Sequence, residues 1–166
     1  MRDTREFDSF YLGSVARLTS QVYAMAGGAA DAEDIVQEAY ARAWQRWDKV
    51  SRYDNPEAWV RTVAFRLTVG AWRRAVSGLR AYRRHGAAEP TAGLDPNYVA
   101  VVAALRRIRP EQRRAIVLYH LVGMGIREIA AETGVAEGTV RARLTRGRQA
   151  LAPLLSERER ELSYRD

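Results

Sequence analysis

Apolar side chains recur at helical spacing through almost the whole chain, and one stretch interrupts them. In the first part Tyr11, Leu18 and Val22 belong to such a stripe, and no segment shows the sustained alternation of a strand. Residues 81–96, AYRRHGAAEPTAGLDP, contain two Gly and two Pro and no apolar period. We therefore predict an all-α protein with two small helical domains, residues 1–80 and 97–166, joined by a flexible linker over residues 81–96.

Caps and breakers divide each domain into helices. In the first domain, Gly27-Gly28 ends one helix, Asp31 caps a second that runs to Trp47, and Asn55-Pro56 opens a third that ends near residue 76. The second domain is expected to hold four helices, at residues 98–108, from 110 onwards, at 126–133 and at about 137–155. The charged tail from Ser156 is expected to fray.

The composition argues against several classes of function. The chain has no cysteine, and its two histidines, His85 and His120, are 35 residues apart, so we expect no metal site and no cofactor. No nucleophile–base pair is apparent, so we expect no enzyme. The longest apolar run, residues 98–105, is too short to insert in a bilayer, and the first ten residues lack the apolar stretch of an export signal. We expect a cytoplasmic protein.

Basic residues are numerous and unevenly distributed. Of 27 basic residues 26 are arginine; residues 1–80 carry 12 basic and 10 acidic residues, and residues 97–166 carry 13 and 8. Codon usage in a GC-rich genome would produce the same bias towards arginine. Arginine nevertheless suits phosphate and guanine edges well, so the second domain is expected to be the main binder of duplex DNA.

The segment from Met124 to Leu151 has the pattern of a helix-turn-helix. Gly134 suits the left-handed turn between two helices, and Val135 fills the angle between them. On the last helix one side is apolar, and the other carries small residues, which allow close approach to a groove, and arginines, which can reach bases or phosphates. The inward residues are Val140, Leu144, Gly147 and Leu151, and the outward residues are Glu137, Gly138, Arg141, Ala142, Thr145 and Arg146. The alternative is an ordinary surface helix with solvated arginines.

A helix-turn-helix by itself fits both a stand-alone regulator of transcription and a sigma factor. The segment 109–151 resembles region four of the extracytoplasmic-function (ECF) sigma factors. In the first domain, D-A-E-D-I-V-Q-E-A-Y-A-R-A-W resembles their polymerase-binding helix, and N-P-E-A-W-V-R-T-V-A-F-R-L resembles the helix after their −10 loop. Within the family the chain looks closest to the compact actinobacterial type. The interpretation as a stand-alone regulator assigns no function to the first domain.

The resemblance implies a sigma factor that binds core RNA polymerase, recognises −35 and −10 elements and helps to melt the promoter. Contacts with the clamp helices of the β′ subunit are implied for Glu33, Asp34, Gln37, Glu38 and Arg42. Read from the residues alone, the acidic side chains at this helix start could simply complement the helix dipole. The other partners implied are the β flap tip, duplex and melted promoter DNA, and an anti-sigma protein that the sequence does not identify.

The resemblance also assigns DNA contacts. For the melted −10 strand these contacts fall on the loop before the third helix and on that helix itself, at Arg52, Tyr53, Asn55, Arg61, Arg66, Arg73 and Arg74. Trp44 in the second helix and Trp59 in the third are expected to be core residues. Arg66 and Gly70 stand where the family usually has Asn and often Asp, so the resemblance does not define the preferred base. For the −35 duplex the residues are Glu137, Gly138, Arg141, Ala142, Arg143, Thr145, Arg146 and Arg148. The apolar stripe of Ile116, Leu118, Tyr119 and Val122 is expected partly to pack the domain and partly to meet the flap tip.

Overall fold

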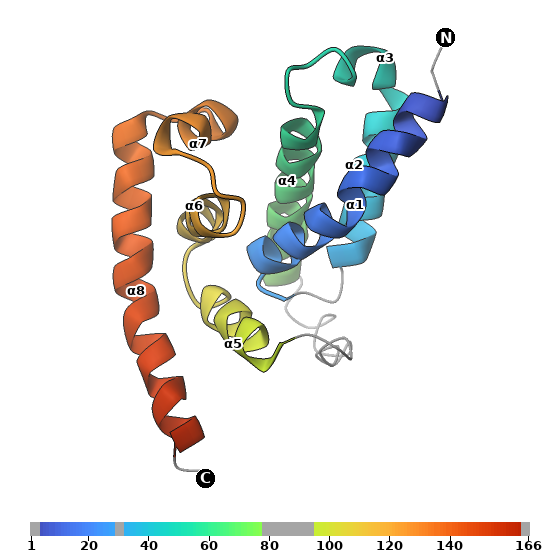
Figure 1. Ribbon diagram of the computed structural model, residues 1–166. Helices are drawn as coiled ribbons and strands as arrows, with labels where there is room; N and C mark the ends of the chain where they lie inside the picture. The colour runs from blue at the N-terminus through green and yellow to red at the C-terminus, as the bar shows by residue number, and fades with distance from the viewer. Residues whose placement is uncertain (1–3, 29–31, 78–94, 164–166) are drawn as a thin grey trace. The chain divides into compact units, whose positions relative to one another are not determined.

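The computed structural model describes residues 4–28, 32–77 and 95–163, and every element in these ranges is a helix (Figure 1). The all-α prediction is confirmed. These residues divide into two compact units, the first formed by residues 4–23 and 32–77 and the second by residues 24–28 and 95–163. Most of the predicted linker, residues 81–94, lies outside the described residues.

The first unit contains four helices, α1 (Thr4–Ala26), α2 (Ala32–Gln45), α3 (Trp47–Val50) and α4 (Pro56–Ser77). Long α1, α2 and α4 run alongside one another, and short α3 lies at one end of α2 (Figure 1). Apolar residues from all four helices form the core, since Leu18, Val36, Val50 and Ala64 are all at most 2% exposed. Burial of this apolar surface, rather than helix propensity alone, holds the unit together.

The second helix is shorter than the sequence predicted. The prediction ran it to Trp47, but Arg46 leaves the helical conformation at φ −119° and ψ 21°, and α3 starts at Trp47. The break lets Trp47 enter an aromatic cluster, with its ring centroid 5.1 Å from those of both Phe7 and Phe10 on α1. Trp47 is 3% exposed there. Tertiary packing therefore overrides the local continuation of the helix.

The second unit contains α5 (Pro96–Leu105), α6 (Pro110–His120), α7 (Ile126–Thr133) and α8 (Glu137–Ser163). Asp95 caps α5, accepting from the backbone N–H of Asn97 at 2.9 Å, so this helix starts just inside the predicted linker. Helix α8 passes through Pro153 and continues to Ser163, so it ends later than the predicted boundary near residue 155. No helix among the described residues is long and apolar enough to cross a membrane.

A buried arginine closes the turn between α5 and α6. The Arg113 guanidinium donates to the backbone carbonyls of Leu105 at 2.7 Å and of Arg106 and Ile108 at 3.1 Å. Burial, followed by the nearby Arg106 charge, lowers the pKa of Arg113. Its donors satisfy carbonyls that the end of α5 leaves without helical partners. Arg113 therefore stabilises the α5–α6 pair, against which α7 and α8 pack.

Candidate functional site

Helix α2 presents a polar, largely acidic face. Its apolar residues Ile35, Val36 and Ala39 are buried, and all five residues predicted to contact polymerase are exposed. They are Glu33, Asp34, Gln37, Glu38 and Arg42. The structure thus brings these five side chains together on one surface of one helix.

Two interactions order part of this acidic face. Arg42 donates to Glu38 one helical turn away at 2.7 Å, and the Gln37 amide donates to the Tyr11 hydroxyl of α1 at 3.0 Å. The exposed Glu38–Arg42 pair contributes only about 0.3–0.5 kcal/mol to stability. The carboxylates of this face can therefore exchange bound water for an arginine of a partner with little loss of folding stability.

The loop between α3 and α4 carries three of the residues predicted to meet the −10 strand. Arg52 and Tyr53 are exposed, Tyr53 to 37%. The Asn55 side-chain oxygen accepts from the backbone N–H of Ala58 at 2.9 Å, which confirms the predicted cap at the start of α4. Asn55 thereby fixes where the loop ends.

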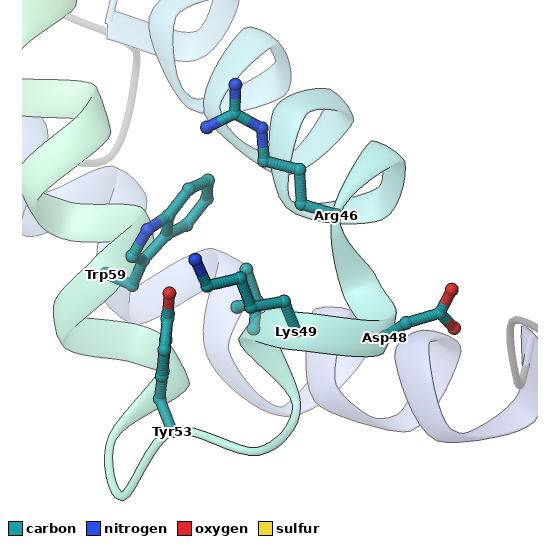
Figure 2. Close-up of a pocket in the computed structure, with 6 residues that line it drawn as sticks. Arg46, Asp48, Lys49, Tyr53 and Trp59 are labelled. Carbon is teal, nitrogen blue, oxygen red and sulfur yellow. The ribbon is translucent and has the colours of Figure 1, made fainter.

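Next to this loop is a pocket of about 360 Å³, which Figure 2 shows in close-up. Its wall contains two aromatic side chains, two cationic ones and one carboxylate, and the lining residues are Arg46, Asp48, Lys49, Val50, Tyr53 and Trp59. Lys49 and Tyr53 point towards Trp59, whereas the Asp48 carboxylate is turned away from them (Figure 2). An aromatic wall with cations beside it suits a stacked nucleobase and its phosphate.

Sequence reasoning missed part of this pocket. Trp59 was expected in the core, but it is half-buried and its indole faces the pocket. Trp44, also expected in the core, is half-buried, with its ring centroid 5.1 Å from that of Phe7. Arg46 and Lys49 were not selected as site residues. Lys49 is the one lysine among 27 basic residues, and that rarity was the available clue.

The four arginines of α4 do not share one surface. Arg66, Arg73 and Arg74 are exposed, and Arg66 and Arg73 are seven residues apart, which places them on the same side of the helix. Arg61 is only 3% exposed, and its guanidinium donates to the Gln21 side-chain oxygen of α1 at 3.1 Å. Arg61 is therefore engaged inside the first unit and is not presented to a nucleic acid.

The turn between α7 and α8 has the geometry of a helix-turn-helix. Gly134 adopts φ 69° and ψ 29°, a left-handed conformation, and its N–H donates to the Ala130 carbonyl at 2.9 Å. Val140, Leu144 and the other predicted inward residues of α8 are buried. A side chain at Gly147 would meet Ile116 of α6 at 3.1 Å, so the glycine allows the two helices to pack closely.

The outer side of α8 carries the residues predicted to read duplex DNA. Glu137, Gly138, Arg141, Thr145, Arg146 and Arg148 are exposed, and Ala142 and Arg143 are half-buried. Arg141 pairs with Glu137 at 3.1 Å, an exposed contact between successive turns. Because such a pair is weak, Arg141 can leave it for a phosphate or a base.

Arg148 lies against the end of α6 rather than beside Arg141. Its guanidinium carbon is 5.2 Å from the centre of the Tyr119 ring, and its nitrogens are 3.3 and 3.4 Å from the His120 Nε2. Partial burial, and then the Arg148 charge, lower the pKa of His120. In the same helix Ile116 and Leu118 are buried, as expected for packing, and Tyr119 is 37% exposed. The contact of this stripe with the flap tip stays a prediction.

Comparison with known proteins places this architecture in the sigma-70 class. Residues 11–77 match the family model of Sigma-70 region 2, and residues 98–151 match that of Sigma-70, region 4. A solved sigma factor, RpoE of Bartonella quintana in complex with the anti-sigma factor NepR, shares the fold with a TM-score of 0.77. It is 24% identical, and the alignment covers 92% of this chain and 98% of that one.

Similar curated proteins identify the family more narrowly. The ECF sigma factor SigJ of Mycobacterium tuberculosis is 37% identical over 81% of this chain, which spans 46% of SigJ, about half of its length. SigM of the same species is 34% identical, with 87% of this chain and 71% of SigM covered. EcfG of Rhodopseudomonas palustris is 30% identical, with 87% and 82% covered. The chain belongs to the ECF RNA polymerase sigma factors.

Proposed function

We propose that this protein binds core RNA polymerase and directs promoter-specific initiation of transcription. The observation that carries the proposal is the presence of both sigma-70 regions in one chain, each on a folded unit. Polymerase would perform the chemistry and this chain would select the site. Core polymerase and promoter DNA are the partners, and both belong to the cytoplasm.

The acidic face of α2 is the proposed polymerase contact. Glu33, Asp34 and Glu38 are exposed on it, and carboxylates in this setting form charge-assisted pairs with arginines. The position in the first turn of the helix gives Glu33 and Asp34 a dipole-stabilising role as well. The two roles are compatible, because the dipole interaction leaves the outer carboxylate oxygens accessible.

The two DNA contacts are proposed to divide between single and double strand. The pocket at Tyr53 and Trp59 offers stacking faces for a base extruded from the melted −10 element, and Arg52 and Arg66 offer charge along the strand. The N-terminal turns of α8, with Arg141 and Arg146 exposed, would enter the major groove at the −35 element. Arg61 is left out of this surface because it is buried.

The test is run-off transcription with core polymerase on a library of promoters, followed by sequencing of the transcript starts. Wild-type protein is expected to produce defined starts that core polymerase alone does not. The double variant Asp34→Lys, Glu38→Lys is expected to lose retention on core polymerase and transcription together while remaining folded, since exposed helix positions contribute little to stability. Asp8→Lys, an exposed reversal on α1, is the matched control and is expected to retain both.

A stand-alone helix-turn-helix regulator is the alternative function. It would bind duplex DNA through α8 without polymerase, and it would give the acidic face and the pocket no role. Co-purification with core polymerase distinguishes the two functions. Equal retention of the wild type and the Asp34→Lys, Glu38→Lys variant would rule out the acidic face as the contact.

A further inference from the structure

We propose that Lys49 makes the pocket beside α3 selective for the keto bases guanine and thymine over the amino bases adenine and cytosine. The inference rests on the proposed function, in which this pocket receives one base of the melted strand. It concerns which base is accepted, and it assigns that choice to a residue outside the set that the sequence had indicated.

The pocket has the size and the walls of a site for one base. Its volume of about 360 Å³ is within the range of about 300–1,000 Å³ common for small-ligand sites. Tyr53 and Trp59 supply the aromatic surface, and Val50 adds an apolar contact. Stacking on such rings tolerates any of the four bases, because each has a π face. Affinity can therefore come from the rings, whereas selection must come from polar groups.

The charged side chains that reach into the pocket are cations, and the Tyr53 hydroxyl beside them can donate or accept a hydrogen bond. Lys49 extends towards Trp59 and lies close to Tyr53 in the view of Figure 2, with its ammonium at the aromatic wall. An ammonium carries three donors and no acceptor, and the Arg46 guanidinium likewise only donates. Asp48 is the one carboxylate among the described lining residues, and its oxygens point away from the rings.

Cationic donors at this wall favour bases whose edge presents acceptors. Lysine and arginine pair with guanine O6 and N7, and thymine offers O4 at the corresponding edge. Adenine and cytosine place an amino group there, whose hydrogens would face the ammonium. Their usual partners are Asn or Gln for adenine and Asp or Glu for cytosine. Of these, Asn55 uses its side-chain oxygen to cap α4, and Asp48 is turned outwards (Figure 2).

The experiment uses holoenzyme assembled from core polymerase and the full chain, on promoters randomised across the melted segment. Sequencing of the transcripts gives the base preference at each position. Wild type is expected to show one position at which guanine and thymine exceed adenine and cytosine about fivefold or more, the lower end of the discrimination by a good polar contact. Lys49→Met is expected to reduce that excess to less than twofold at this position alone.

Two further variants separate selection from general binding. Lys49→Arg keeps a donor-only cation and is expected to retain the keto preference, which also tests the proposal if Lys49→Met fails to fold by circular dichroism. Arg66→Ala removes an exposed cation of α4 that does not line the pocket. It is expected to lower the transcript yield and leave the preference at the selected position unchanged.

The outcomes are distinct. A wild-type profile with no keto-preferring position, or the same preference in Lys49→Met, would overturn the role of Lys49 while transcription itself continued. An even loss of yield in Lys49→Met, with the preference kept, would show that Lys49 contacts phosphate and would also overturn it. Failure of wild-type holoenzyme to start transcription on any promoter would instead refute the proposed function.

Discussion

Replacing Arg61 by alanine is expected to destabilise the first unit by about 2–4 kcal/mol, whereas Arg66→Ala on the same helix is expected to change stability by less than about 0.5 kcal/mol. Both residues had been predicted to bind the −10 strand. Arg61 is 3% exposed, and Arg66 is exposed. The two variants therefore separate an arginine that holds the fold from one that is available to DNA.

The magnitude follows from the partners that Arg61 would leave behind. The Gln21 side chain is also 3% exposed, and its oxygen would lose the donor that lies 3.1 Å away, which costs about 1–3 kcal/mol for a buried polar group. Removing the buried methylenes of the arginine adds about 0.8 kcal/mol each. Relief from burying the guanidinium offsets part of that sum.

Glu57 limits the stability that is lost in Arg61→Ala. It lies 3.7 Å from Arg61, but Arg17 also holds it through two hydrogen bonds, of 3.0 and 2.7 Å. The carboxylate therefore keeps a bidentate partner when Arg61 is removed, and its side chain is 20% exposed to water. For this reason the expected cost stays below the roughly 3–5 kcal/mol of a broken, fully buried ion pair.

The assay is urea unfolding followed by tryptophan fluorescence. All four tryptophans, at positions 44, 47, 59 and 72, belong to the first unit, so the signal reports on that unit. With a slope of about 2 kcal/mol per molar urea, the midpoint for Arg61→Ala should fall by about 1–2 M. Arg66→Ala should leave the midpoint in place and reduce transcription instead. An unchanged midpoint in Arg61→Ala would refute the structural role assigned to Arg61.

Three other predictions concern single side chains. Tyr53→Ala is expected to weaken promoter melting by about 1–3 kcal/mol through lost stacking, which permanganate footprinting would detect; an unaltered melted region would limit Tyr53 to a structural role. Arg141→Ala is expected to relax selectivity at one −35 base at a cost of about 1–3 kcal/mol; even weakening with a shallower salt dependence would identify a phosphate contact instead. Burial, with Arg148 adding to it, lowers the pKa of His120 from 6.5. The unfolded chain then binds the proton more readily, so stability is fully present above pH 6.5 and declines as the pH falls through the lower folded pKa. Thermal unfolding followed by circular dichroism should show less of this decline in His120→Gln, and identical pH profiles would contradict it.

Much of the architecture can be predicted from the local sequence. Apolar spacing sets the helices, and the short-range chemistry of caps and turns sets several of their ends. Asn55 caps α4 through its own side chain, and Gly134 takes the left-handed conformation that an L side chain resists. The inward side of α8, from Val140 to Leu151, follows from the 3.6-residue period alone. Each of these features depends on residues within a few positions of one another.

The tertiary structure decided what depends on distant partners. Glu57, one helical turn earlier, is the only nearby charge that separates Arg61 from Arg66 in the sequence, and it does not predict burial. The buried partner of Arg61 is Gln21, 40 residues earlier, which supplies an acceptor on the facing helix. Packing of Trp47 against α1 breaks the second helix at Arg46. That break turns α3 and the following loop so that Lys49 and Trp59 line one pocket, although helical period had assigned Trp59 to the core. Side-chain burial is set by the facing element, and the position of that element is not contained in the spacing of a single helix.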